Sequence, residues 1–214
     1  MSDHPTPTAL TLAEGLHDDE IHVWSMRYER AGGRAPLRRL LAVYLDLRAE
    51  DVTLVDTVHG RPELHGAHRG RLRFNWSHSA DRALVAIARS VQPGIDLEHR
   101  PRRADRNVLA LAQRFFAPVE ADALGALPAD ERAAAFLRLW TVKEAVLKAQ
   151  GRGLAYGLHR VVVDLGGSAT ARVHLDADSV AAWQVRELTL DPDWVAALAW
   201  RGPSMAVRWC GQAR

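Results

Sequence analysis

Cysteine is almost absent from this chain. Cys210 is the single cysteine among 214 residues, so an intramolecular disulfide is excluded and a reducing compartment is expected. Long apolar runs are absent too, since none approaches the roughly 18 residues of a membrane-spanning helix. Residues 1–20 carry no basic region followed by an apolar core, as a secretory signal peptide would. We therefore expect a cytoplasmic protein with no membrane partner.

Charge of one sign does not dominate the chain either. The formal net charge is only +2, from 28 basic and 26 acidic residues. Such a balance gives no argument for nucleic-acid binding, and we expect no nucleic-acid partner. With 48% hydrophobic and 25% charged residues, the composition is that of a globular protein that can bury a core without disulfides.

Lysine is the scarcest charged residue. Only Lys143 and Lys148 are lysines, and all other basic residues among the 28 are arginines. Both lie in Trp140-Thr-Val-Lys143-Glu144-Ala-Val-Leu-Lys148, where helical spacing places Trp140, Glu144 and Lys148 on one face. An ammonium is a compact point charge that suits phosphate, whereas a guanidinium is a planar fork. The stretch indicates either a metal-and-phosphate site or an ordinary solvated Glu–Lys pair.

Hydrophobic periodicity and turn signals predict an α+β protein. Helices are expected over residues 34–48, 107–116, 118–127 and 128–150, and strands over 21–26, 52–58, 72–76, 83–88, 94–98, 159–164, 170–175, 183–190, 194–200 and 205–209. A turn and loop are expected over 60–70. The order suggests two similar lobes of helices and small antiparallel sheets: a mobile segment 1–20, an N-terminal lobe 21–92 and a C-terminal lobe 93–214.

The stretch Gly94-Ile95-Asp96-Leu97-Glu98 places two carboxylates on one face of a strand. Adjacent carboxylates repel each other unless a cation or a proton lies between them. Hard oxygen ligands of this kind suit Mg²⁺ or Mn²⁺. The alternative is a strand with one face in water, which explains the same alternation.

The stretch Phe74-Asn75-Trp76-Ser77-His78-Ser79 brings hydroxyls, an imidazole and backbone N–H groups to one point, where they suit phosphate oxygens. The alternative is a polar turn that caps its own backbone. Arg34 and Arg38 share one helix face and suit either phosphate or solvent. His59, His65 and His68 match no zinc spacing, and we expect them in a loop.

Taken in order, these motifs resemble one family. The series is Gly60-Arg61-Pro62, Phe74 to Ser79, Gly94 to Glu98, Arg114-Phe115-Phe116-Ala-Pro-Val-Glu120, Trp140 to Lys148, and Gly151-Arg-Gly153-Leu154. It resembles the 4′-phosphopantetheinyl transferases of the monomeric, surfactin-synthetase-activating type. The likeness runs from about residue 34 to residue 158. Its most specific part is G-[IV]-D-[IL]-E followed about forty residues later by W-[ST]-x-K-E-[AS]-x-x-K.

The resemblance implies a reaction and an architecture. Members of the family transfer the 4′-phosphopantetheine arm of coenzyme A to a serine of an apo acyl or peptidyl carrier protein, and they release adenosine 3′,5′-bisphosphate. Their two lobes are related by a pseudo-twofold axis, with coenzyme A in the cleft between them. We accordingly expect a Mg²⁺-dependent monomer, with Mn²⁺ as the alternative ion and coenzyme A as co-substrate.

The resemblance also implies roles for individual residues. Asp96, Glu98 and Glu144 would bind the metal ion. Glu144 would act as general base, directly or through a water, with Asp96 and Lys148 as the other catalytic residues, while Lys148 and His78 would place positive charge at the leaving phosphate. The residues expected to bind coenzyme A or brace its site are Arg34, Arg61, Pro62, Ser77, His78, Lys143 and Lys148, with Trp140 as a further brace.

The carrier protein usually presents an acidic helix beside its serine. A basic and apolar patch that includes Arg114, Phe115 and Phe116 is expected to meet it, although a phenylalanine more often belongs to the core.

One departure from the family concerns the short segment after residue 26, where relatives carry basic residues for the 3′-phosphate. We expect Arg27, Arg30, Arg34 and Arg61 to serve instead. Two alternatives to the transferase are a Mg²⁺-dependent hydrolase of nucleotide pyrophosphates and a catalytically weak module that binds coenzyme A or carrier protein.

Overall fold

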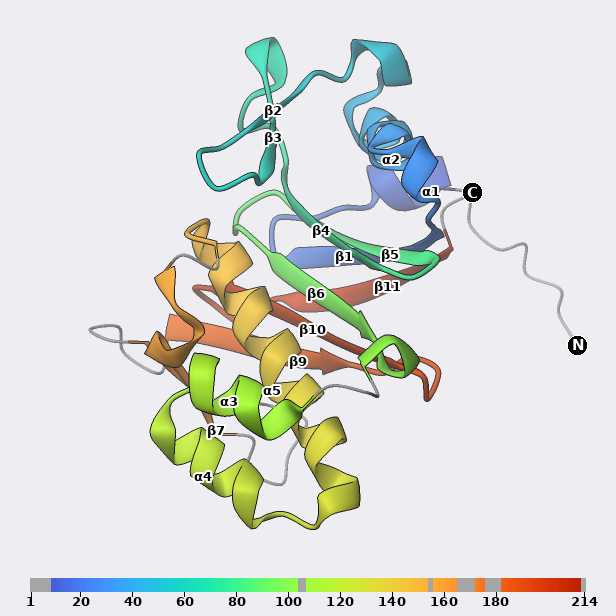
Figure 1. Cartoon of the computed structure of the whole chain (residues 1–214). Helices are drawn as coiled ribbons and strands as arrows, with labels where there is room; N and C mark the ends of the chain where they lie inside the picture. Colours follow the sequence, from blue (N-terminus) through green and yellow to red (C-terminus); the bar gives the residue numbers. More distant parts are fainter. Residues whose placement is uncertain (1–8, 104–106, 154–155, 165–171, 176–181, 213–214) are drawn as a thin grey trace, which may run out of the picture.

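The computed structural model describes residues 9–103, 107–153, 156–164, 172–175 and 182–212. The helices are α1 (Ala9–Glu14), α2 (Ala35–Leu45), α3 (Val108–Phe115), α4 (Pro118–Ala126) and α5 (Ala129–Gln150). The strands are β1 (Glu20–Arg27), β2 (Leu54–Asp56), β3 (Pro62–Leu64), β4 (Arg73–Ser79), β5 (Arg82–Ala88), β6 (Gly94–His99), β7 (Val161–Asp164), β8 (Arg172–Leu175), β9 (Trp183–Leu188), β10 (Trp194–Arg201) and β11 (Ala206–Gln212). Figure 1 shows their arrangement, which confirms the α+β class.

Two larger sheets form the centre of the molecule. One has the strand order β11-β1-β5-β4 and the other β6-β10-β9, with the small pairs β2-β3 and β7-β8 outside them. The pairing of β1 with β11 is parallel, so the expectation of purely antiparallel sheets was wrong for this pair. The physical reason is a crossover: β10 belongs to the second sheet, and the chain then passes into the first sheet, where β11 runs beside β1.

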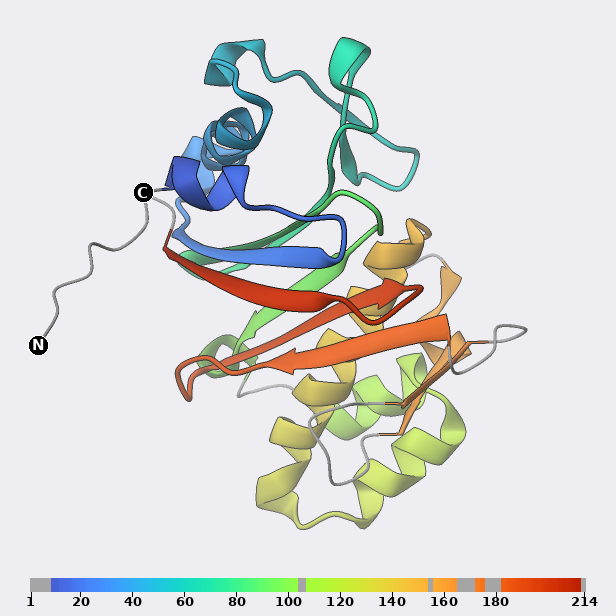
Figure 2. The ribbon, with the colours of Figure 1, turned by 180° about the vertical axis from the view of Figure 1, so that it is seen from behind.

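The two sheets pack face to face, and helices cover their outer faces. Ile21 and Val23 of β1 lie between the sheets with Ile95 and Leu97 of β6. The alternate β1 residues, such as Trp24, pack on the other side with apolar residues of α2. Helix α5 packs against the outer face of the second sheet, in one cluster with residues of β9 and β10. The resulting layers are α2, sheet, sheet and α5, as Figures 1 and 2 show from opposite sides.

Most elements were predicted closely, and the main differences lie between residues 52 and 70. Helices α3, α4 and α5 coincide with the predicted helices within two residues. The strand expected over 52–58 is reduced to β2, and the loop expected over 60–70 contains β3. Residues 1–8 of the segment expected to be mobile lie outside the described residues, but α1 follows them, and Leu12 and Leu16 are buried in the cluster around α2.

None of the helices among the described residues has the length and apolarity to span a membrane.

Candidate active site

The site begins with the close approach of α5 to β6. A Cβ atom on Gly94 would lie 2.0 Å from the backbone oxygen of Ala145 and 2.3 Å from the backbone nitrogen of Ala149. Only a residue without a side chain fits there. Because side chains alternate along a strand, Asp96 shares this helix-facing side with Gly94, while Ile95 lies in the core between the sheets. Gly94 therefore sets the distance at which α5 side chains meet Asp96.

Lys148 of α5 is the centre of a polar cluster. Its ammonium donates to Asp96 Oδ1 (2.7 Å), to Ser77 Oγ (3.0 Å) and to the carbonyl oxygen of Ile95 (3.2 Å). The Ser77 hydroxyl donates to the same Asp96 oxygen, at 2.9 Å. Three motifs that are far apart in the sequence, on β4, β6 and α5, thus meet at one buried carboxylate.

Strand β4 contributes more than Ser77. Asn75 Oδ1 accepts a hydrogen bond from the Ile95 backbone N–H at 3.0 Å, and Ser79 Oγ accepts one from the His99 N–H at 3.2 Å. Side chains on one face of β4 thereby satisfy the backbone of β6, which belongs to the other sheet. Sequence analysis missed the part of Asn75 and Ser79. The spacing could have indicated it, because Asn75, Ser77 and Ser79 are alternate residues of one strand and therefore share one face.

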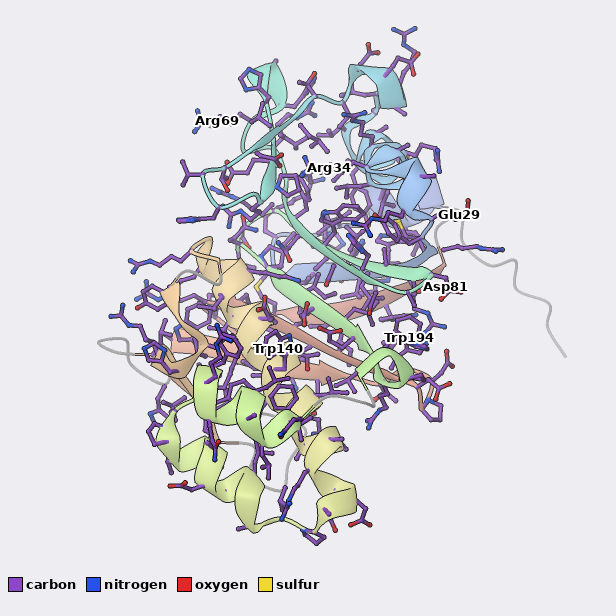
Figure 3. The ribbon with its side chains drawn as sticks, in the orientation of Figure 1. Glu29, Arg34, Arg69, Asp81, Trp140 and Trp194 are labelled. Atoms are coloured by element: carbon purple, nitrogen blue, oxygen red, sulfur yellow. The ribbon has the colours of Figure 1, made fainter. Side chains whose placement is uncertain are left out.

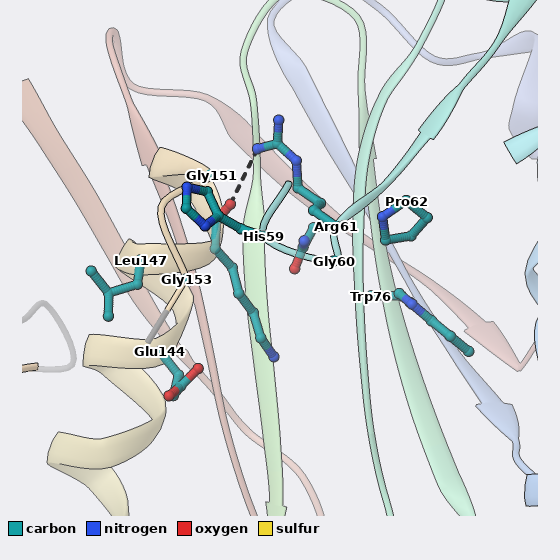
Figure 4. A pocket seen from close by; sticks show the side chains of 11 residues that line it. His59, Gly60, Arg61, Pro62, Trp76, Glu144, Leu147, Gly151 and Gly153 are labelled. Atoms are coloured by element: carbon teal, nitrogen blue, oxygen red, sulfur yellow. Dashed lines mark hydrogen bonds between the residues drawn. The ribbon is translucent and has the colours of Figure 1, made fainter. Parts of the chain in front are cut away.

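An open pocket of about 260 Å³ lies beside this cluster. It is lined by His59, Gly60, Arg61, Pro62, Asn75, Trp76, Glu144, Leu147, Lys148, Gly151 and Gly153. The Gly60-Arg61-Pro62 turn, the β4 motif, the helical motif and the glycines after α5 all contribute, as Figure 4 shows. Of the residues predicted for coenzyme A, this pocket brings together Arg61, Pro62 and Lys148.

Arg61 connects the two sides of the pocket. Its Nη1 donates to the carbonyl oxygen of Lys148 at 3.4 Å, drawn as a dashed line in Figure 4, and its Nη2 donates to Glu63 Oε1 at 2.5 Å. Gly151 ends α5 with φ of +73°, and a Cβ on it would lie 2.9 Å from Arg61 Nη1, so the guanidinium would have to shift. The left-handed conformation at this position favours glycine, which also leaves the Arg61 guanidinium in place.

Arg34 and His78 lie elsewhere. Arg34 pairs with Asp56 at 2.7 Å and does not line the pocket (labelled in Figure 3). His78 stacks on Tyr28, with ring centroids 4.2 Å apart and an interplanar angle of 19°. Desolvation lowers the pKa of His78, and the charges of Lys148 and Arg30 lower it further. A lowered pKa favours the neutral imidazole in the free protein, and the positive charge expected of His78 at the leaving phosphate stays a prediction.

Lys143 has a different environment from Lys148. Lys143 is fully buried, and its ammonium donates to Glu120 Oε2 (2.5 Å), to the Leu158 carbonyl (3.2 Å) and to the Val161 carbonyl. Burial lowers the pKa of Lys143, although the charge and hydrogen bond of Glu120 raise it. Among the described residues, these acceptors join α5 to α4, to the turn before β7 and to the start of β7. Lys143 therefore braces α5 internally, and it does not line the pocket.

Trp140 lies one turn before Glu144 in an aromatic cluster. Its ring meets Phe115 edge-on at 6.2 Å and lies 5.7 Å from Phe136 (Trp140 is labelled in Figure 3). Phe116 is buried in the core, whereas Phe115 is half-buried and lies beneath the Arg114 guanidinium, 5.0 Å away. Trp140 thus fixes α3 against α5 through side-chain packing.

The three carboxylates predicted to bind metal are not assembled into a ready ligand cluster. Among the described residues, no three His, Cys, Asp or Glu side chains are grouped so that they would hold a metal ion. Two features nevertheless fit a divalent cation: Asp96 and Glu98 are both buried, and Asp96 Oδ2 is a buried oxygen without a hydrogen-bond partner in the described part of the chain. These are hard oxygen donors of the type that Mg²⁺ prefers. In this structure the cation beside Asp96 is the Lys148 ammonium.

Comparison with known proteins identifies relatives of this chain. The model of the 4′-phosphopantetheinyl transferase superfamily matches residues 92–199. The 4′-phosphopantetheinyl transferase HetI of Nostoc sp. (strain PCC 7120) is 35% identical over 94% of this chain and 84% of its own length. The 4′-phosphopantetheinyl transferase psf-1 of Bacillus pumilus is 31% identical over 81% of this chain and 71% of its own. For the transferase Sfp of Bacillus subtilis, the values are 28%, 78% and 70%.

These relatives define the chain as a group-transfer enzyme. The chain belongs to the 4′-phosphopantetheinyl transferase superfamily. Within it, the protein is a transferase of the type that Sfp represents, which confirms the family and the enzyme class predicted from the motifs.

Proposed function

We propose that this transferase moves the 4′-phosphopantetheine arm of coenzyme A to a serine of an apo acyl or peptidyl carrier protein. The observation that carries the proposal is that Lys148, which lines the pocket together with Arg61 and Glu144, also binds Asp96 and Ser77 beside that pocket. The pocket offers positive charge for a pyrophosphate from Arg61 and Lys148, and a carboxylate from Glu144. A monomer acting in the cytoplasm is part of the same proposal.

The metal ion of the reaction would be held by Asp96, Glu98 and Glu144. When bound, Mg²⁺ would supply charge neutralisation for the phosphates of the substrate. Ser77 supports this arrangement, because its hydroxyl fixes the orientation of the Asp96 carboxylate.

The chain's own groups would handle the proton and the leaving charge. The carrier serine oxygen attacks the β-phosphorus, and the bond from that phosphorus to the bridging oxygen breaks, so adenosine 3′,5′-bisphosphate leaves with the electron pair. Glu144, which lines the pocket, would receive the serine proton directly or through a water. Lys148 and Arg61 would hold the phosphates in line. For the 3′-phosphate we propose Arg61 together with the exposed Arg27 and Arg30.

The test is the intact mass of an apo carrier protein after incubation with this protein, coenzyme A and Mg²⁺. We expect a gain of one phosphopantetheine group, lost when EDTA is added. Asp96→Asn and Glu144→Gln should each reduce the rate at least about 100-fold. Glu131→Gln is the matched control, since Glu131 lies exposed in the first turn of the same helix and should change nothing.

Two outcomes would contradict the proposal in different ways. Transfer that persists in EDTA would remove the metal from the mechanism, and a near-normal rate for Glu144→Gln would remove that residue as the base. If no tested carrier gains mass while coenzyme A still binds, the protein is a binding module instead.

A further inference from the structure

Lys148 stands where a metal ion would neutralise Asp96. Three oxygen atoms surround its ammonium, from the carboxylate of Asp96, the hydroxyl of Ser77 and the carbonyl of Ile95, at 2.7–3.2 Å. A cage of oxygen atoms around one positive charge is also what a hard cation needs. Among the described residues, no three carboxylates form a metal-binding cluster, and the Lys148 ammonium lies beside Asp96 instead. We attribute both observations to the same ion pair.

The burial of Asp96 explains why a cation has to be present. The side chain of Asp96 is only 7% exposed, and a buried carboxylate without a countercharge is strongly disfavoured. The ion pair of Asp96 in the described part of the chain is with Lys148. Its second oxygen, Oδ2, is buried and accepts no hydrogen bond from the described residues, so it retains an unused position for another cation.

We propose that Lys148 is an exchangeable counter-ion. In the metal-free protein its ammonium neutralises Asp96; when the metal ion takes that carboxylate, the ammonium moves into the adjoining pocket and binds the pyrophosphate of the substrate. The exchange follows from charge, because an ammonium and a divalent cation repel each other and cannot share one carboxylate at full strength. This inference rests on the proposed function, since it assigns Mg²⁺ to Asp96.

The lysine has the means to move. Its side chain is 26% exposed, and Lys148 also lines the pocket that Arg61 and Glu144 share. A lysine carries its charge on a flexible four-carbon stem with rotatable donors, whereas an arginine would grip the carboxylate with a planar fork. This difference gives a reason for a lysine here, in a chain whose other basic residues, apart from Lys143, are all arginines.

The experiment measures Mn²⁺ binding in the absence of coenzyme A, from the electron paramagnetic resonance signal of free Mn²⁺. Lys148→Met removes the competing charge, and we expect Mn²⁺ to bind at least about tenfold more tightly than to the unaltered protein. Lys148→Arg keeps the charge in a more rigid form and should bind Mn²⁺ more weakly than the unaltered protein. Adding Asp96→Asn to Lys148→Met should abolish the gain, which identifies the carboxylate concerned.

The outcomes separate this inference from the proposed function. If Lys148→Met and the unaltered protein bind Mn²⁺ equally and Asp96→Asn abolishes binding, the metal site stands and the exchange is overturned. If no form of the protein binds Mn²⁺, the exchange is overturned, while the carrier mass assay with and without EDTA decides separately on the proposed function. Should Lys148→Met fail to fold, Lys148→Gln replaces it, because an amide still donates a hydrogen bond to Asp96 without the charge; the same gain in affinity is expected, and its absence overturns the exchange.

Discussion

Gly94 shows how one missing side chain sets the distance between the two elements that carry the site. The motif Gly94 to Glu98 stands out in the sequence for its carboxylates, but the glycine is the residue on which the helix rests. The backbone of α5 lies only 2.0 Å from the position that a Cβ atom would occupy, so any side chain would push the helix away. Lys148 would then lose its bonds to Asp96, since the lysine is on the helix and the carboxylate is on the strand.

Gly94→Ala should therefore destabilise the protein and impair transfer. We expect the free energy of unfolding to fall by about 3 kcal/mol, from overpacking against rigid backbone atoms, with a rate of transfer reduced at least about tenfold. Guanidinium unfolding and the carrier mass assay measure the two effects. The control is Gly125→Ala in α4, where nothing lies within 4 Å and alanine favours the helix by about 0.5–1 kcal/mol. Equal stability of the two variants would contradict the role of Gly94.

For single residues, the sequence predicts which residues belong to the site better than it predicts where their side chains point. Ser77, Asp96 and Lys148 were grouped by the order of their motifs, and the structure brings them together. His78 was grouped with Ser77, yet adjacent residues on a strand point to opposite faces, so His78 stacks on Tyr28 instead. Which face of β4 meets β6 depends on how the sheets pack, and one sequence does not contain that information.

The elements of the C-terminal half are held together by a buried ion pair. Glu120, near the start of α4, accepts hydrogen bonds from Lys143 of α5 and from the Val163 backbone N–H of β7, at 2.5 and 2.8 Å. Glu120 also caps its own helix, because Oε2 accepts from the Ala117 N–H at 3.0 Å. The side chains of Lys143 and Glu120 are 0% and 5% exposed. A buried ion pair of this kind fixes how the elements pack on each other more than it adds net stability.

Lys143→Met should destabilise the protein by about 3–5 kcal/mol, because Glu120 would be left as a buried charge without its partner. The double variant Lys143→Met with Glu120→Gln should recover part of this loss, since the uncompensated charge is then gone. Denaturant unfolding of the two single variants and the double variant gives the coupling energy. Additive losses would show that the two side chains act independently.

The surroundings of the two lysines of α5 could not be predicted from the sequence. A five-residue separation places Lys143 and Lys148 about 140° apart around α5, so they face different surroundings. The sequence predicted the helix and its end at Gly151, because both depend on local pattern. The partner of Lys143 lies 23 residues earlier, in another helix, and only the tertiary structure brings it within reach.

For the whole molecule, the least predictable feature is the last strand. A boundary near residue 92 divides the sequence into two α+β halves, and that division remains a prediction. However, β11 comes from the second half and completes the sheet of the first half, beside β1. A parallel pairing between strands that are so far apart in the chain leaves no local signal, since neither strand carries a turn or a short connection that would name its partner. The halves are therefore joined through a shared sheet as well as through the contacts of β4 with β6.

A chain that ends after Met205 tests this connection. Its β1 would lose its parallel neighbour, whose register runs from Glu20↔Ala206 to Ser25↔Gln212. With roughly 1 kcal/mol of net stability for each hydrogen bond lost, we expect a decrease of several kcal/mol, comparable with the total stability of many domains. Tryptophan fluorescence during guanidinium unfolding measures it, because both sheets contain tryptophans, among them the buried Trp24 and Trp200.

The shape of the unfolding transition shows whether the two halves unfold together or independently. If the sheets unfold as one cooperative unit, the complete chain shows a single transition, and the shortened chain shows one at a lower guanidinium concentration. If the halves are independent, the shortened chain should show two transitions, one shifted to a lower guanidinium concentration and one with an unchanged midpoint. A chain that lacks only residues 213–214 is the matched control, since β11 remains complete. The pocket is built from β3, β4 and α5, so a single shifted transition would also mean that the active site depends on a strand that contributes no residue to it.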